Sequence, residues 1–277
     1  MENLGMQIAD EQKRNADILY PLLLRKILPD GRKKVVAVSG GSGVGKTGMA
    51  WLLKERLDAD GIPALIVSGD NYPHRIPAYN DAERLRIFRM AGLRGLLEEN
   101  VYNPAVREEL KELQIHNHDA KEFPGKYPWL AVYHRWGDTA LEEYLGTENE
   151  LLFSEVSFVL SAFKKGEETL MLRRMGREAH EVWYEETKSG SRQVLILEWT
   201  HGNSPLLTGV DVSIVLKSTP EETLENRKKR NRDAAVASPF VARVLRIEQK
   251  KIDRELGRAD LIQDMKGNIC CDVQERG

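Results

Sequence analysis

Short apolar segments recur along this chain and alternate with longer amphipathic segments. Four of the apolar segments are short, and they are residues 35–38, which show no polar alternation, and residues 64–67, 193–197 and 210–216. Runs of this kind predict strands that are buried on both faces of a parallel sheet. Because helical patterns lie between them, we expect an α/β three-layer sandwich with a mostly parallel sheet.

The amphipathic segments have apolar residues at helical spacing. They predict helices over residues 8–28, 47–60, 81–99, 104–113, 148–165 and 240–256. In the third of these, the residues expected in the core are Leu85, Phe88, Leu93, Leu96 and Leu97. Residues 169–186 begin and end with strand patterns, and residues 259–273 predict two short strands. The aromatic-rich residues 123–136 are interpreted as packing rather than as the lining of a pocket.

Composition and charge exclude several classes of function. The chain has 277 residues, of which 41% are hydrophobic, and a formal net charge of -2, which gives no electrostatic case for nucleic acid or an anionic membrane. No apolar run approaches the roughly 18 residues that span a bilayer, and the first residues are too polar for a signal peptide, so we expect a cytoplasmic protein. Cys270 and Cys271 are adjacent, and we expect unpaired thiols.

A glycine-rich segment follows the first apolar run. It fits the Walker A pattern, and its residues are Gly40, Gly41, Ser42, Gly43, Val44, Gly45, Lys46 and Thr47. In this pattern the loop amides hold nucleotide phosphates, the lysine reaches the β- and γ-phosphates, and the threonine hydroxyl binds Mg²⁺. A glycine-rich turn that binds nothing is the competing interpretation. The position between a strand and a helix favours phosphate binding.

Asp70 follows the second predicted strand, and ligands of parallel sheets lie beyond the carboxyl ends of strands. We therefore expect Asp70 near the phosphates, where it would act as a base or bind Mg²⁺. An Asx turn is the alternative. In the next loop Tyr72, His74 and Arg75 are candidate substrate-binding residues, with a plain surface loop equally compatible.

Glu198 ends the third apolar run in the position of a Walker B carboxylate, so it is a candidate ligand of Mg²⁺ or substrate. His201 follows it, and a hydrogen-bonded loop histidine is its more common role. The basic residues near 173–177 would hold an acidic acceptor or face solvent, and Arg173 is the candidate substrate contact. The charged run 227–233 predicts a lid whose Arg230 and Arg232 stabilise transition-state charge, or else a solvated helix.

These motifs, in this order, resemble the phosphoribulokinase and uridine kinase family of P-loop kinases. The residues that carry the resemblance are GGSGVGKT at 40–47, Asp70 with the loop after it, LEWTHG at 197–202 and RKKRNRD at 227–233. The resemblance implies a P-loop NTPase fold. It also implies Asp70 as the catalytic base, Glu198 as a ligand, and a lid that contains Arg230 and Arg232. Similarity to adenylylsulfate kinases is weaker.

Taken together, the sequence predicts an ATP-dependent kinase that phosphorylates a hydroxyl of a small polar metabolite, with ATP and Mg²⁺ as cofactors. The alternatives are an adenylylsulfate-kinase-like enzyme and a nucleotide-dependent switch ATPase without a small acceptor. We expect one domain over residues 1–277, with a leading helix at 1–30, an acceptor-side insertion at 100–190 and a lid at 227–240. We expect no nucleic-acid or membrane partner, and a homodimer is left open.

Overall fold

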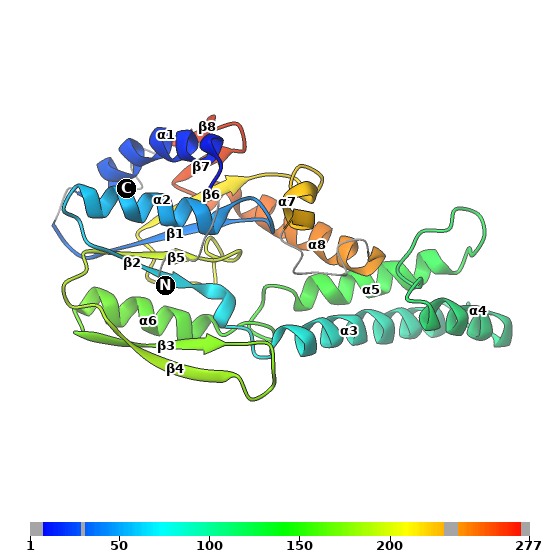
Figure 1. Cartoon of the computed structure of the whole chain (residues 1–277). Coiled ribbons are helices and arrows are strands. Elements are labelled where there is room, and N and C mark those ends of the chain that lie inside the picture. The colour runs from blue at the N-terminus through cyan, green and yellow to red at the C-terminus, as the bar shows by residue number, and fades with distance from the viewer. Residues whose placement is uncertain (1–7, 29–30, 230–237, 273–277) are drawn as a thin grey trace.

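The computed structural model describes residues 8–28, 31–229 and 238–272 (Figure 1). Its main sheet has six strands in the order β2-β5-β1-β6-β7-β8. Their bounds are Lys34–Gly40 for β1, Ala64–Ser68 for β2, Val194–Glu198 for β5, Val212–Lys217 for β6, Leu261–Asp264 for β7 and Ile269–Asp272 for β8. All neighbouring pairs are parallel except β7 with β8. The predicted α/β fold with a mostly parallel sheet is confirmed.

Helices and a hairpin cover the two faces of this sheet. The helices α1 (Asp10–Ile27) and α2 (Lys46–Ala59) lie on one face, and α6 (Phe153–Lys165) lies on the other with the hairpin of β3 (Thr169–Met175) and β4 (Val182–Lys188) (Figure 1). Side chains of β1 alternate between the two cores: Val36 packs with α1 and α2, and Val35 packs with α6. Because both faces are covered, the central strands are buried along most of their length.

A group of helices extends from the sheet to one side (Figure 1). It comprises α3 (Pro77–Glu98), α4 (Pro104–Ile115), α5 (Leu130–Tyr144) and α8 (Pro239–Glu255). The aromatic residues Trp129 and Tyr133 are buried in the core of this group, so their predicted packing role is confirmed. Glycines allow the close approach of α3 and α5, since a Cβ on Gly92 would lie 2.5 Å from the Tyr133 ring.

Several predicted boundaries and one core residue were wrong. Leu97 is 60% exposed, because it lies on the side of α3 that faces away from α5 and the core. α3 begins at Pro77, where proline is well placed in a first helical turn, and not at residue 81. α6 begins at Phe153, because residues 147–151 form a turn instead.

The remaining predictions concern the lid, the cysteines and membrane spans. α7 (Leu224–Lys229) is a short helix before residues 230–237, so Arg230 and Arg232 lie outside the described residues. Cys270 and Cys271 are free thiols, as predicted. In the part of the chain that the structure describes, no helix has the length and apolar character needed to cross a membrane.

The contact between the turn after β2 and Trp199 gives a test of this packing. A Cβ added at Gly69 would lie 2.0 Å from Cγ of Trp199, whose side chain is 2% exposed. Gly69→Ala is therefore expected to destabilise the protein by about 1–3 kcal/mol or more, because the indole cannot move away in a packed core. Urea denaturation measures this change.

Gly257→Ala is the matched control, since no atom lies within 4 Å of its added Cβ. It should change the free energy of unfolding by less than about 1 kcal/mol. Equal effects of the two substitutions would contradict the close packing of Trp199 against this turn.

Candidate active site

The glycine-rich loop connects the central strand β1 to α2. Gly40, Gly43 and Gly45 have φ values of 140°, 81° and 102°, a region that side chains disfavour. Gly40 also lies against β6, where an added Cβ would be 2.5 Å from the carbonyl oxygen of Leu216. The loop leads directly into the N-terminus of α2, whose first N–H groups have no partner within the helix. This arrangement is suited to binding phosphate.

Lys46 is the first residue of α2, and its ammonium turns back into the loop. Nζ donates to the carbonyl oxygens of Gly40 at 3.0 Å and Gly41 at 3.1 Å, and the residue is 7% exposed. An ammonium has three donors, so one remains for a phosphate oxygen.

Glu198 lies at the end of β5, between the ends of β1 and β2. Thr47 Oγ1 donates to its Oε1 at 3.2 Å, and Ser68 Oγ donates to its Oε2 at 3.3 Å. Burial and the nearby Asp70 charge raise the pKa of Glu198, and Lys46 and the two hydroxyls oppose this effect only in part. A buried carboxylate with this environment would gain from a bound cation.

Asp70 is exposed, in the 3-10 turn Gly69–Asn71 that follows β2. The structure thus brings together four residues that the sequence indicated separately: Lys46, Thr47, Asp70 and Glu198. No group of three or more His, Cys, Asp or Glu side chains among the described residues could hold a metal ion. The two carboxylates and the Thr47 hydroxyl instead fit Mg²⁺, which keeps several waters and is bound partly by substrate phosphates.

The loop after Asp70 is held by the β3–β4 hairpin. Arg173 of β3 donates through Nη1 to the carbonyl oxygens of Asn71 and Pro73, both at 2.7 Å, and is 7% exposed. The guanidinium is thus used to position the loop. This contact could not be predicted from the sequence, because nothing in the residues around Arg173 indicates that its partners are the distant carbonyl groups of Asn71 and Pro73.

The predicted substrate residues of this loop also have protein partners. Tyr72 is 1% exposed and packs in the core beneath the loop. His74 Nε2 lies 2.8 Å from the carbonyl oxygen of Glu148, and Arg75 donates to the Tyr144 hydroxyl at 3.1 Å. None of these three side chains lines the cavity described next.

A cavity of about 770 Å³ extends from the glycine-rich loop to the helices α3 and α8. Ser42 and Asp70 line one end of it, Asn80 and Arg84 line the other, and Glu248 of α8 lies between them, since it contacts Arg84 and also lines a small pocket with Ser42. Its volume is within the range of small-molecule sites. The polar residues of the second end were missed by sequence reasoning, since they lie inside helix patterns without any motif.

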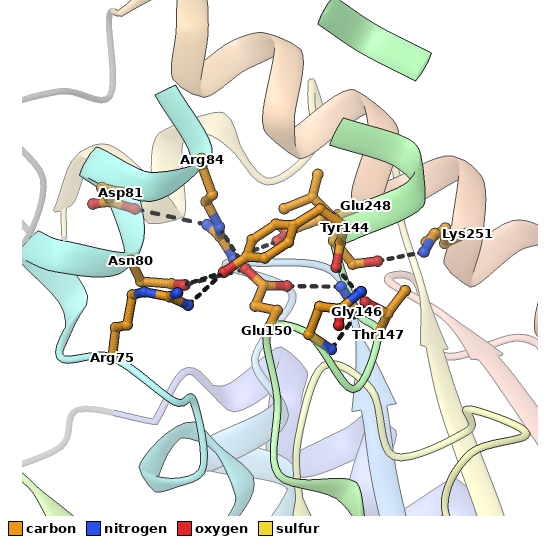
Figure 2. A network of polar contacts seen from close by, with 12 residues as sticks. Arg75, Asn80, Asp81, Arg84, Tyr144, Gly146, Thr147, Glu150, Glu248 and Lys251 are labelled. Carbon is orange, nitrogen blue, oxygen red and sulfur yellow. Dashed lines mark hydrogen bonds and ion pairs between the residues drawn. The ribbon is translucent and has the colours of Figure 1, made fainter. Parts of the chain in front are cut away.

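Figure 2 shows how these polar residues are arranged around Arg84. Arg84 Nε donates to Glu150 Oε1 at 2.6 Å, and its Nη2 donates to Glu248 Oε1 at 3.1 Å. Glu150 is fully buried, and it also accepts from the Gly146 N–H at 2.7 Å and from Asn80 at 3.1 Å. Although burial by itself raises the pKa of Glu150, Arg84 and the Gly146 N–H lower it below its ordinary value.

His201 lies beside this cluster and lines the same cavity. Burial lowers the pKa of His201 to about 4, and the nearby Glu150 carboxylate offsets only part of this effect. The imidazole is therefore neutral near pH 7. Its ring packs edge-on against Trp199, with the ring centroids 5.6 Å apart.

A second cavity, of about 490 Å³, lies on the other side of the glycine-rich loop, between α1 and the end of β7. Its polar residues include Gln12, Asn15 and Asn226. Gln12 donates to the carbonyl oxygen of Gly45 at 2.7 Å, and Asn226 donates to that of Gly43 at 3.2 Å. The predicted leading helix is thus in direct contact with the phosphate-binding loop.

Comparison with known proteins finds similarity to kinases. No protein-family model matches the chain. The chain is 37% identical over 235 residues to the bifunctional alpha-galactosidase/sucrose kinase AgaSK of Mediterraneibacter gnavus. The predicted resemblance to P-loop kinases is confirmed. The match covers 85% of this chain and 20% of that protein, so the chain spans about a fifth of the length of its relative.

Three solved structures are similar to this P-loop chain. They are a putative fructose transport system kinase from Silicibacter sp. TM1040 (20% identity, TM-score 0.49, covering 88% of this chain and 95% of that chain), a possible uridine kinase from Bacillus stearothermophilus (13%, 0.44, 91% and 98%) and the phosphoribulokinase from Rhodobacter spheroides (12%, 0.48, 85% and 71%). All three TM-scores are below 0.5, so no activity follows from these similarities.

The contacts of Arg173 predict a role in stability. Arg173→Met is expected to destabilise the protein by roughly 1.5–3 kcal/mol, because two charge-assisted hydrogen bonds to the loop are lost. Arg174→Met, at the next position of β3, is the control, since Arg174 pairs with the half-exposed Glu185 and such pairs contribute about 0–1 kcal/mol. Urea denaturation compares the two variants. A larger effect of Arg174→Met would contradict the positioning role of Arg173.

The low pKa of His201 predicts a dependence of stability on pH. Between pH 6.5 and about 4 the unfolded chain binds a proton at this residue and the folded chain does not, so stability falls as the pH falls. His201→Gln should reduce the loss between pH 7.5 and pH 5 by at most about 2 kcal/mol. Chemical denaturation at both pH values measures this, with the exposed His116→Gln as control. An unchanged pH dependence in His201→Gln would show that His201 is not responsible.

Proposed function

We propose that this protein is an ATP-dependent kinase that transfers the γ-phosphoryl group to a hydroxyl of a small polar metabolite, with a sugar as acceptor. The observation that carries the proposal is the continuity of the larger cavity. It reaches from Ser42 of the phosphate-binding loop, past Asp70, to the polar side chains of α3 and α8. A phosphate donor and an acceptor would therefore meet beside Asp70, as direct phosphoryl transfer requires.

The roles of the residues at the phosphate end follow from their positions. The loop amides and Lys46 would hold the β- and γ-phosphates. Thr47 and Glu198 would hold Mg²⁺, which neutralises charge on the phosphates. The smaller cavity beside Gln12 is the natural place for the nucleoside part of ATP, since it adjoins the same loop.

Asp70 is the better candidate for the base. It is exposed and lines the cavity, whereas Glu198 is buried and accepts from two hydroxyls. Asp70 would accept the proton of the attacking hydroxyl as the bond to phosphorus forms. Arg230 and Arg232 of the predicted lid would stabilise the charge on the transferred group.

The acceptor class rests on two supports. The relative's name includes a sucrose kinase activity, which makes sucrose the first acceptor to test. The acceptor end of the cavity combines carboxylate and amide side chains with apolar walls, which suits the hydroxyl groups and C–H faces of a sugar.

The kinase proposal is tested with Lys46→Ala. ADP release with Mg-ATP is measured against sucrose, other sugars, nucleosides, sugar phosphates and hydroxy acids. One acceptor should stimulate ADP release. Lys46→Ala should reduce turnover by at least about 100-fold, because it removes the ammonium group that would stabilise the negative charge of the phosphates. Lys54→Ala, on the same helix but paired with Asp58, is the control and should keep normal turnover. Slow, acceptor-independent ADP release would instead support a switch ATPase.

The base assignment is tested with Asp70→Asn. This variant should lose at least about 100-fold in kcat, because the amide cannot take a proton from the acceptor hydroxyl. ATP binding should be retained, and fluorescence titration with a labelled nucleotide checks this. A near-normal kcat would remove Asp70 from the role of base.

A further inference from the structure

Two arginines of α3 line the acceptor end of the large cavity, and both are already paired with carboxylates. Arg89 makes a two-pronged pair with Asp119, with Nε and Nη2 at 2.9 Å and 2.8 Å from the two carboxylate oxygens. Arg84 pairs with Glu150 at 2.6 Å and with Glu248 at 3.1 Å. Arginine is the side chain that best binds phosphate or carboxylate groups of ligands. In this protein, however, both guanidinium groups are already bound by the protein's own carboxylates.

The two carboxylates that hold Arg84 differ in their surroundings. Glu150 is fully buried, accepts from the Gly146 N–H and does not line the cavity, so it serves the turn before α6. Glu248 lines the cavity from α8 and accepts directly from Arg84 (Figure 2). Asp81 also lines the cavity but lies farther from Arg84, at 3.7 Å, so Glu248 is the hydrogen-bonded partner of Arg84 that an acceptor in the cavity would meet.

The charges at the cavity surface favour an uncharged ligand. Within the described residues, the carboxylates that line it are Asp70, Asp81, Asp119 and Glu248, and the cationic side chains that line it are Arg84 and Arg89. Both arginines are paired with carboxylates, so neither of them offers an unpaired cation to a phosphorylated or carboxylate-bearing acceptor. An uncharged polyol would instead donate its hydroxyl protons to these carboxylates.

The other walls of the cavity are apolar and fit the same ligand. They are formed by Pro73, Leu151, Trp199, Phe240, Val241 and Val244. Such surfaces pack against the C–H faces of a sugar ring, while they offer nothing to a phosphate group. The apolar wall and the carboxylates thus both favour an uncharged polyhydroxy compound.

We propose that Glu248 is a specificity-determining residue: by holding Arg84, it excludes anionic acceptors and restricts the reaction to uncharged polyhydroxy compounds. This inference rests on the proposed kinase function. It goes beyond that function because it assigns the exclusion of sugar phosphates and hydroxy acids to one side chain. Removing the charge of Glu248 leaves its hydrogen bond to Arg84 in place but takes away the negative charge beside the guanidinium, so Arg84 attracts an anionic group more strongly.

The test is the substitution Glu248→Gln, which keeps the shape of the side chain and its hydrogen bond to Arg84 but removes the charge. We expect wild-type kcat/KM to be at least about tenfold higher for sucrose and fructose than for fructose 6-phosphate and glycerate. In Glu248→Gln this ratio should fall at least about fivefold, chiefly through a lower KM for the anionic acceptors. Glu255→Gln, on the same helix but outside the cavity, should keep the wild-type ratio.

A loss of stability alone would lower both activities and leave their ratio unchanged, and that result would overturn the proposal. Wild-type preference for fructose 6-phosphate or glycerate would overturn it as well. The same four compounds are also titrated with Mg-ADP present, following the fluorescence of the protein's tryptophans. This binding measurement is independent of turnover, so an inactive protein would refute the kinase function while the selectivity of the cavity is still decided.

Discussion

The parallel pairing of β5 with both β1 and β2 is the constraint on which the site depends. Its register places Glu198 opposite Val38 on one side and opposite Ser68 on the other. Because backbone hydrogen bonds fix this register, β5 and β2 end level with each other and β1 continues only through Ser39 and Gly40, so the segments that follow open at the same edge of the sheet. Lys46 at the start of α2 and Asp70 in the turn after β2 therefore meet around one carboxylate.

This edge of the sheet contains a buried carboxylate. Burial and the nearby Asp70 charge raise the pKa of Glu198, while Lys46 and two hydroxyl donors oppose this effect. Both carboxylate oxygens accept a hydrogen bond, from Thr47 and from Ser68. A cation bound beside Glu198 would favour its charged form.

At the acceptor end, by contrast, the buried carboxylates are paired with an arginine. Arg84, Glu150 and Glu248 come from three separate segments, and their ion pairs join α3, the turn before α6 and α8 (Figure 2). Removing one member of this cluster would leave a buried charge without a partner, which is strongly destabilising. The cluster therefore connects three segments of the chain at the wall of the cavity.

The sequence by itself determined the strands of the sheet, the phosphate-binding loop and the acidic residues that follow β2 and β5. These features are local, since apolar runs, glycine spacing and strand ends each depend on a few neighbouring residues. Only the tertiary structure decided the acceptor end, because the pairs of Arg84 with Glu150 and Glu248 join residues 66 and 164 positions apart. It also turned Tyr72 into the core and used Arg173 to hold a loop, because side chains with the same local pattern can face solvent, a ligand or another segment until the chain is packed.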